Sequence, residues 1–259
     1  MGKTVTAIMV VANQKGGVGK TTTVLNLALL LSQQGSRVLL VDLDPQASLT
    51  AALGLDSYRL DRSSFSLLMY PEMTLTRIMR TISSTLALVP GSVDLAAAAI
   101  KMVQEQYPLN RLRGVLRQSR FTFDYVLVDT PPGLNVLTVA ALIAADSVIV
   151  PAQCSHDAIQ GVRALQDVIA RIRSAMGNPD LKLRGVLPTF FDPEAVYARK
   201  VLEELHALLP GQVFDTPIPY DVMVADAPHM GKAVVDYAPE SLGAKAYRRL
   251  AEAIGSAKD

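Results

Sequence analysis

Cysteine is almost absent from this chain of 259 residues, in which Cys154 is the single example. A lone cysteine excludes an internal disulfide and is typical of a reducing compartment, so we expect Cys154 to be a small packed residue. The sequence has no run of eighteen apolar residues and therefore predicts no membrane span. Its start lacks the ordered charged, apolar and small-residue regions of a signal peptide. These absences together predict a cytoplasmic protein.

Excess charge of either sign is also lacking. The chain carries 25 lysines and arginines against 24 acidic residues, a formal net charge of +1. No global field draws such a protein to nucleic acid or to a membrane, so any such contact has to come from a local patch. Hydrophobic residues make up 50% of the chain, enough to bury strands on both faces. We expect one large α/β domain over residues 1–259.

A glycine-rich loop at residues 12–22 is the most informative stretch. It lies between an apolar, strand-like run at 5–11 and a helix-like run at 24–31. Strand, glycine loop and helix in this order favour a phosphate-binding loop, because the loop and helix N–H groups form an anion nest. In such a loop Lys20 reaches the β- and γ-phosphates and the Thr21 hydroxyl ligates Mg²⁺. The expected nucleotide-binding residues of this loop are Lys15, Gly16, Gly17, Val18, Gly19, Lys20, Thr21 and Thr22.

One position departs from the usual pattern G-x-x-x-x-G-K-[ST], since Gln14 stands where the first glycine belongs. A second lysine, Lys15, opens the loop and has no obvious task inside it. A glycine turn that binds nothing is the alternative, but the flanking strand and helix argue against it. The sequence Lys-Gly-Gly-Val-Gly-Lys-Thr is a deviant Walker A motif, and the chain resembles the ParA/MinD family of P-loop ATPases. The resemblance implies that Lys15 crosses a dimer interface to the partner's nucleotide and acts with Lys20 in catalysis.

A second apolar run at 37–42 reads as a buried parallel strand, and it ends in Asp42 and Asp44. Ligands of open α/β sheets bind at the carboxyl ends of strands, so both acids are expected at the phosphate site. The sequence Asp-x-Asp-Pro-Gln is the second signature of the family. By resemblance, Asp44 is the catalytic acid that orients water and is a candidate metal ligand. In isolation, Asp44 also fits a helix cap before Pro45.

A third apolar run, 123–129, ends in Asp129 and reads as a Walker B strand beside the Mg²⁺ shell. The Pro-Pro-Gly sequence that follows predicts a loop able to respond to the γ-phosphate, and the family carries the same Asp-x-Pro-Pro-Gly. The switch candidates are Asp129, Pro131, Pro132 and Gly133. The metal candidates are Thr21, Asp44 and Asp129.

The remaining pattern alternates strands with helices, which predicts a doubly wound, mostly parallel sheet with helices on both faces. Ser155 is expected to cap a helix to Ala175, and Asp192 a helix to Leu208. The closing helix, Ser241–Ala257, should turn Leu242, Ala246, Leu250, Ala253 and Ile254 inward. Further strands are expected at 86–89, 147–151 and 183–189, and further helices at 64–70, 75–79, 92–105 and 109–119.

The resemblance covers nearly the whole chain, as far as the segments 227–232 and 233–237. It implies that the adenine is flanked by two turns, whose candidate residues are Pro188, Thr189, Pro217, Pro219 and Asp221. The branch looks like Soj/ParA partition ATPases without an N-terminal DNA-binding domain. In these, ATP closes a sandwich homodimer that coats nonspecific nucleoid DNA. A ParB-like partner then triggers hydrolysis, which is slow in its absence.

Soj-like sequences carry arginines that are missing here, where Glu194, Tyr220 and Met223 occupy their places. Losing several phosphate contacts costs orders of magnitude in DNA affinity at physiological salt. Other basic residues can replace them, although each also fits an ordinary solvated helix face. These candidate DNA contacts are Arg199, Lys200, Lys245, Arg248 and Arg249.

Other functions on this scaffold fit less well. A MinD-like membrane role needs a bulky amphipathic C-terminal helix, which residues 253–259 do not provide. An iron–sulfur electron-transfer ATPase needs two cysteines per subunit. A metabolic enzyme, such as an amidotransferase-coupled synthetase or dethiobiotin synthetase, needs a small-molecule pocket and stays open. The main alternative is an ATP-gated protein that positions a cargo other than DNA.

Overall fold

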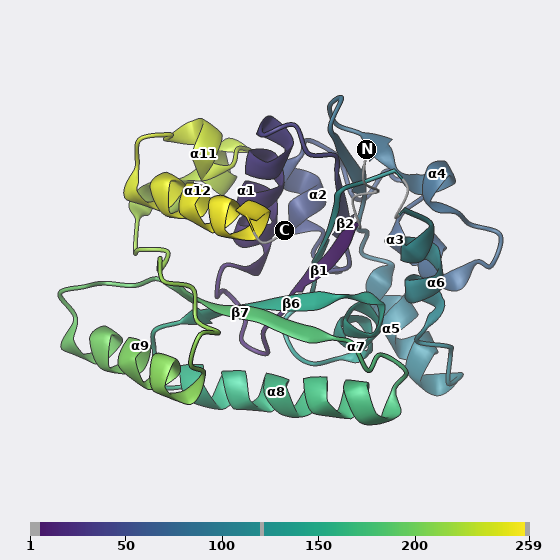
Figure 1. Ribbon diagram of the computed structural model, residues 1–259. Coiled ribbons are helices and arrows are strands. Elements are labelled where there is room, and N and C mark those ends of the chain that lie inside the picture. Colours follow the sequence, from purple (N-terminus) through teal and green to yellow (C-terminus); the bar gives the residue numbers. More distant parts are fainter. Residues whose placement is uncertain (1–5, 120–121, 257–259) are drawn as a thin grey trace.

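A twisted sheet forms the centre of the computed structural model, which describes residues 6–119 and 122–256. Within these ranges the sheet has seven strands in the order β3-β4-β2-β5-β1-β6-β7 (Figure 1). Neighbouring strands run parallel except for the pair β3 and β4. The strands are β1 Ala7–Val11, β2 Val38–Asp42, β3 Arg80–Thr81, β4 Leu86–Val89, β5 Tyr125–Asp129, β6 Ser147–Gln153 and β7 Lys182–Thr189.

Helices cover both faces of this sheet, so alternate strand residues enter two separate cores. Ile8 and Val10 of β1 pack with one set of helices, whereas Met9 and Val11 pack with the other. The first set is α3 Ser64–Met69, α4 Leu75–Ile78, α5 Leu95–Gln104, α6 Arg111–Gln118, α7 Val136–Ala144, α8 Ala158–Ala175 and α9 Val196–Leu208. The second is α1 Lys20–Gln33, α2 Ser48–Ala52, α11 Val234–Tyr237 and α12 Leu242–Gly255, with α10 Val222–Asp226 and the 3₁₀ helix η2 Ala227–Met230 beside them. The expected doubly wound α/β fold is confirmed.

The strand register brings the predicted motifs to one edge of the sheet. Asp129 pairs with Asp42 of β2 on one side and with Val11 of β1 on the other. Both strands that end in these aspartates are buried along their whole length, as continuous apolar runs in parallel sheets are. The glycine loop after β1 therefore begins beside the two aspartates.

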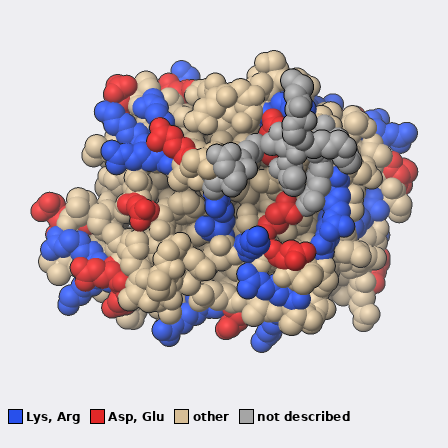
Figure 2. Space-filling view, in the orientation of Figure 1, with Lys and Arg blue, Asp and Glu red and all other residues tan. Residues whose placement is uncertain are grey.

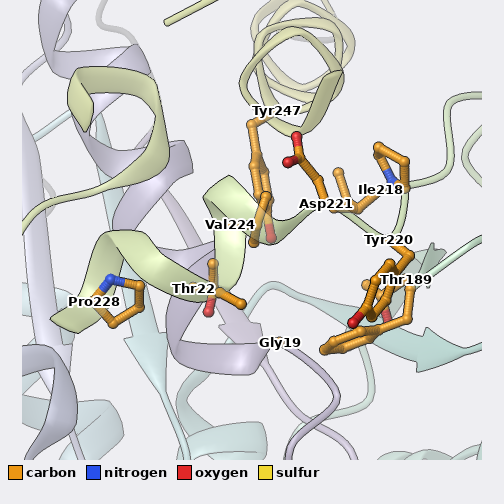
Figure 3. Close-up of a pocket in the computed structure, with 12 residues that line it drawn as sticks. Gly19, Thr22, Thr189, Ile218, Tyr220, Asp221, Val224, Pro228 and Tyr247 are labelled. Carbon is orange, nitrogen blue, oxygen red and sulfur yellow. The ribbon is translucent and has the colours of Figure 1, made fainter. Parts of the chain in front are cut away.

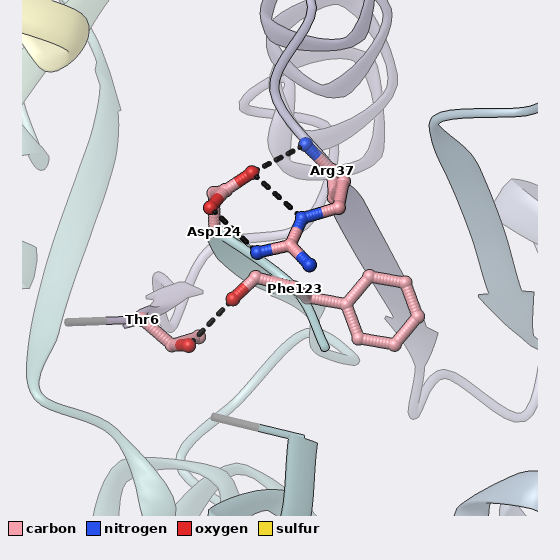
Figure 4. Close-up of polar contacts among 4 residues, drawn as sticks. All are labelled: Thr6, Arg37, Phe123 and Asp124. Atoms are coloured by element: carbon pink, nitrogen blue, oxygen red, sulfur yellow. Dashed lines mark hydrogen bonds and ion pairs between the residues drawn. The ribbon is translucent and has the colours of Figure 1, made fainter. Parts of the chain in front are cut away.

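Polar contacts fasten the opposite edge (Figure 4). The guanidinium of Arg37, just before β2, donates to both carboxylate oxygens of Asp124, at 3.1 and 3.2 Å. The Arg37 amide donates to the same carboxylate at 2.8 Å, and the Thr6 hydroxyl donates to the Phe123 carbonyl at 2.5 Å. The beginnings of β1, β2 and β5 are thereby held in register.

Two expected helix caps are wrong. Helix α8 begins at Ala158 rather than after Ser155, whose hydroxyl accepts a hydrogen bond from Lys15 instead. Helix α9 begins at Val196, because the Asp192 carboxylate accepts from the Glu194 amide at 2.9 Å and forms a separate turn. Local side-chain turns of this kind compete with helix initiation.

The inward face of α12 also differs from the expectation. Ser241 does cap the helix, and Ala246, Leu250 and Ile254 are buried as predicted. Leu242 is 69% exposed, Ala253 is also exposed, and the buried aromatic is Tyr247. The buried positions form one stripe of helical period, and Leu242 and Ala253 fall outside it. The expected ends at Val5 and Ala257 lie outside the described residues.

A buried network holds the Asp42 carboxylate at the end of β2. The Thr50 amide and hydroxyl donate to one carboxylate oxygen at 3.0 and 2.6 Å, and the Asp44 amide donates to the other at 3.1 Å. The Gly91 amide donates to the Thr50 hydroxyl oxygen at 2.8 Å. Burial is the main reason why the pKa of Asp42 rises to about 6. A Cβ atom on Gly91 would lie 2.8 Å from the Asp42 carboxyl carbon.

We expect Gly91→Ala to destabilise the protein, because its methyl group displaces a carboxylate that buried hydrogen bonds fix in place. Overpacking of this kind costs about 1–3 kcal/mol of unfolding free energy. The matched control is Gly114→Ala on the exposed side of α6, where a Cβ meets nothing within 4 Å. That change should stabilise the helix by up to about 1 kcal/mol. Urea denaturation measures the unfolding free energy of both variants. A Gly91→Ala protein as stable as wild type would show that the Asp42 carboxylate is not rigidly held.

Candidate functional site

The loop between β1 and α1 is shaped by two glycines in left-handed conformations. Gly17 has φ 70° and Gly19 has φ 88°, values that side chains disfavour. Gly19 precedes α1 and provides no side-chain cap. The first N–H groups of a helix have no acceptor within it, so here they face the loop. The result is an anion-binding nest at the positive end of α1.

Lys20, the first residue of α1, is 7% exposed. Its ammonium donates to the Lys15 carbonyl at 3.1 Å and so lies across the inside of the loop. Burial lowers the pKa of Lys20, and the charges of Asp129 and Asp44 partly offset that effect. A buried cation at an anion nest suits a polyphosphate ligand.

Asp129 lies next to this cation, at the end of β5. The Thr21 hydroxyl donates to its Oδ2 at 2.7 Å. Its Oδ1 is buried without a hydrogen-bond partner among the atoms that the structure describes. Burial and the neighbouring charge of Asp42 hold the pKa of Asp129 well above its usual range. An unsatisfied buried carboxylate oxygen is costly, so it indicates a place for a cation or for water on a cation.

The oxygen donors at this edge of the sheet suit a magnesium ion. No group of three or more His, Cys, Asp or Glu side chains able to hold a metal occurs in the part of the chain described here. The available oxygens come from Thr21, Asp44 and Asp129. Magnesium commonly takes one or two carboxylates and completes its shell with waters and substrate phosphates. These residues therefore fit a magnesium ion held jointly with a phosphate ligand.

Asp44 is 8% exposed and follows β2 in a fixed turn. Its Oδ1 accepts from the Gln46 amide at 2.9 Å, and its carbonyl accepts from the Ala47 amide at 2.8 Å. The residue that precedes α2 is Ala47, so Asp44 caps a turn rather than this helix. The turn fixes the carboxylate close enough to Lys20 for their charges to interact.

The Pro131-Pro132-Gly133 segment touches the front of the glycine loop. The Gly133 amide donates to the Gln14 carbonyl at 2.9 Å, and the Thr130 hydroxyl donates to the Val11 carbonyl at 2.8 Å. Gly133 has φ 87°, which favours glycine. Asp129 and the loop are thus joined by one short, hydrogen-bonded segment.

A mostly apolar pocket opens beside the loop (Figure 3). Thr22 and Pro228 lie on one side of it, and Thr189 and Tyr220 on the other. Of the expected adenine residues, Thr189, Pro219 and Asp221 line the pocket, whereas Pro188 and Pro217 are not among the lining residues. Lining residues that sequence reasoning missed are Phe190, Ile218, Tyr220, Val224, Ala225, Pro228 and Tyr247.

Backbone hydrogen bonds between two segments distant in sequence form part of the wall of this pocket. The Ile218 amide donates to the Pro188 carbonyl at 2.8 Å, and the Tyr220 amide donates to the Phe191 carbonyl at 3.0 Å. The Thr189 hydroxyl donates to the Val18 carbonyl at 3.0 Å and ties the pocket to the glycine loop. This pairing joins segments that lie far apart in the chain, so no local sequence pattern predicts it. Only the motif residues next to the two segments indicated a pocket here.

Asp221 has a structural task at the pocket wall. Its carboxylate accepts from the amide of Met223 at 2.9 Å and from that of Gly243 at 2.8 Å. It therefore caps α10 and anchors the start of α12. Both oxygens of Asp221 accept backbone hydrogen bonds, so these structural contacts alone explain why an aspartate stands at this position.

The expected DNA contacts do not share one element. Arg199 and Lys200 lie on α9, and Lys245, Arg248 and Arg249 lie on α12, which belongs to the other layer of helices. Arg199 donates to the Pro193 carbonyl at 2.5 Å, and Lys245 lies 3.3 Å from Glu240. Basic and acidic side chains are interspersed on the face shown in Figure 2. On that face no single basic patch dominates.

The parallel sheet, the glycine loop before α1 and the Thr21–Asp129 pair define a P-loop nucleoside triphosphatase fold. A family model described as an AAA domain matches residues 6–183. The sporulation initiation inhibitor protein Soj of Bacillus subtilis is 36% identical over 249 residues, which cover 96% of this chain and 98% of Soj. The chromosome partitioning protein ParA of Myxococcus xanthus is 37% identical over 247 residues, 95% of this chain and 87% of that one.

A solved structure shares the fold at similar identity. It is described as cobyrinic acid a,c-diamide synthase from Mycobacterium smegmatis with bound ADP and magnesium. Its TM-score is 0.82 and its identity 37%, with 96% of this chain and 94% of that chain covered. The chain belongs to the ParA/MinD family of P-loop ATPases, in agreement with the motifs of its sequence. Among the described residues, no helix combines the length and apolarity needed to cross a membrane.

We expect Asp129→Asn to stabilise the ligand-free protein, because it removes one of several like charges buried together. Single stabilising substitutions commonly raise the unfolding free energy by about 0.5–2 kcal/mol, and a destabilised functional site is a place where they cost activity. The matched control is Asp124→Asn, which breaks the ion pair with Arg37 at the opposite edge of the sheet and should destabilise. Thermal unfolding compares both with wild type. If Asp129→Asn unfolded at a lower temperature than wild type, the repulsion between buried carboxylates would not be what destabilises the ligand-free protein.

Proposed function

We propose that this chain is a partition or positioning ATPase, which closes into a homodimer with ATP and Mg²⁺ and opens after hydrolysis to ADP and phosphate. The observation that carries the proposal is the convergence of Lys20, the Thr21–Asp129 pair and Asp44 at one anion nest. Relatives named as chromosome partitioning proteins over nearly the full length support the cellular role. By the same argument, a ParB-like protein stimulates the hydrolysis.

In this proposal the loop N–H groups and the buried Lys20 ammonium bind the β- and γ-phosphates. Thr21 and the unsatisfied Oδ1 of Asp129 hold the magnesium side of the ligand. Magnesium, when bound, neutralises charge on the phosphate oxygens. The mostly apolar pocket lined by Thr189, Ile218 and Tyr220 takes the nucleobase.

Asp44 orients the attacking water. Its Oδ1 is engaged with the Gln46 amide, so the carboxylate has a fixed direction and keeps acceptor capacity for a water O–H. The buried Asp42 carboxylate, fixed by the Thr50 hydroxyl, accepts a hydrogen bond from the Asp44 amide and so stabilises the turn. An acceptor held in one orientation next to the phosphates lowers the barrier by positioning rather than by covalent chemistry.

Lys15 and Gly16 supply the dimer contact in this proposal. The Lys15 side chain is 42% exposed at the front of the loop. A Cβ atom on Gly16 would meet only Pro132 at 3.7 Å, an ordinary contact within the protomer. The protomer itself therefore leaves room at Gly16, and a close approach by the facing loop is the reason for a glycine there.

We expect Asp44→Ala to retain ATP binding and lose hydrolysis, since the side chain directs water and does not line the nucleobase pocket. Water activation contributes about 10²–10⁴-fold to such reactions. The measurements are phosphate release and calorimetric titration with ATP. Asp56→Ala, on an exposed surface, is the matched control. An Asp44→Ala protein that hydrolyses ATP normally, or that no longer binds it, would show that Asp44 has another role.

Nonspecific DNA is the surface that we propose for the closed dimer, with Lys245, Arg248 and Arg249 of α12 as contacts. A second candidate, binding to a cargo other than DNA, is favoured by a specific observation. Residues 201–231 contain no lysine or arginine. Tyr220, which stands in place of a family arginine, is 69% exposed, and Val222 beside it is 55% exposed.

A light-scattering titration with nonspecific DNA across a salt series separates the two. If α12 contacts phosphates, ATP-dependent DNA binding should weaken steeply as salt is added. The double change Lys245→Ala with Arg249→Ala should make the plot of log K against log salt less steep, by about 0.9 for each DNA phosphate that is no longer neutralised. Lys101→Ala with Arg59→Ala, at exposed ion pairs elsewhere, should leave it unchanged. Absence of salt-dependent binding with ATP would favour the other cargo.

A further inference from the structure

The Lys15 side chain is held within its own protomer. Its ammonium donates to the Ser155 hydroxyl at 3.2 Å and lies 3.6 Å from the Asp157 carboxylate. Both partners belong to the connection between β6 and α8, which is separate from the glycine loop. The Lys15 side chain is therefore held in one position within the protomer. Its two partners, Ser155 and Asp157, lie outside the glycine loop.

The main chain of Lys15 is fixed on both sides. Its amide donates to the Asn13 side chain at 3.0 Å, and its carbonyl accepts from the Lys20 ammonium at 3.1 Å. The buried Asn13 amide group donates in turn to the Pro151 carbonyl of β6 at 2.6 Å. The front of the loop is thus tied to the strand that leads to Ser155. Only the Lys15 side chain is left to change position.

The acidic partner is fixed as well. The Ala158 amide donates to the Ser155 carbonyl at 3.0 Å, and the Gly161 amide donates to the Asp157 carbonyl at 2.9 Å. Asp157 occupies the position before α8, yet its side chain makes no capping hydrogen bond there. Its carboxylate therefore serves the contact with Lys15 rather than the usual task of an aspartate at a helix start.

We propose that Asp157 is a positioning residue that retains Lys15 in its own protomer, so that dimer closure has to break two Lys15–Asp157 ion pairs. This inference rests on the proposed function, in which Lys15 reaches the partner's phosphates. Exposed ion pairs of this kind favour the paired state by roughly 1.4- to 5-fold each. Because both protomers contribute one, the dimer dissociation constant should be raised roughly two- to thirty-fold by the pair.

The test is the dimer dissociation constant, measured by sedimentation equilibrium with a non-hydrolysable ATP analogue and Mg²⁺. Asp157→Asn, which keeps the shape and removes the charge, should dimerise roughly two- to thirty-fold more tightly than wild type. Asp157→Glu keeps the charge and should stay close to wild type. Asp167→Asn, an exposed aspartate on the same helix α8, is the matched control and should have no effect.

A cycle with Lys15→Ala separates positioning from structural effects. In the Lys15→Ala background, which should not dimerise, Asp157→Asn should restore no dimer, because the tighter dimer of Asp157→Asn depends on the Lys15 ammonium that the change frees. If Lys15→Ala prevents dimerisation and Asp157→Asn leaves the wild-type constant unchanged or weakens it, this inference is wrong and the proposed function stands. If Lys15→Ala dimerises as wild type does, the sandwich dimer and this inference are both overturned.

Discussion

One ammonium group surrounded by carboxylates is the constraint on which this molecule depends. Lys20 is buried at the carboxyl edge of the sheet, and the charges of Asp129 and Asp44 both act on it. Burial raises the pKa of Asp42 and Asp129, so the folded chain holds these acids at a cost. The parallel strands, fastened at the opposite edge by Arg37 and Asp124, keep them together despite it. A polyphosphate with a divalent cation is the ligand that relieves such an arrangement.

Sequence patterns predicted most of this edge, because each motif directly follows a buried strand. The glycine loop, Asp44 and Asp129 are local signals, and a parallel sheet brings strand ends to one place. Helix α7 gave no comparable signal: its residues are almost uniformly apolar and buried, without the polar side that makes helical periodicity visible. The caps at Ser155 and Asp192 failed because a nearby lysine and a local turn compete for those side chains.

The pocket beside the glycine loop and the position of the Lys15 side chain depend on tertiary pairing instead. Phe191 and Tyr220 are joined through their backbones, and Lys15 meets a connection that lies far from it in the sequence. No single-residue pattern encodes such pairs. Glu194, Tyr220 and Met223 stand where the resemblance to Soj-like sequences predicts arginines, so a binding partner is the property that similarity predicts least.

The most direct test of the account is sedimentation velocity of the wild-type chain with Mg²⁺ and either ADP or a non-hydrolysable ATP analogue. An ATP-gated sandwich requires the γ-phosphate, so we expect a monomer with ADP and a dimer with the analogue at the same protein concentration. The same sedimentation coefficient with both nucleotides would contradict the central claim that ATP closes the dimer.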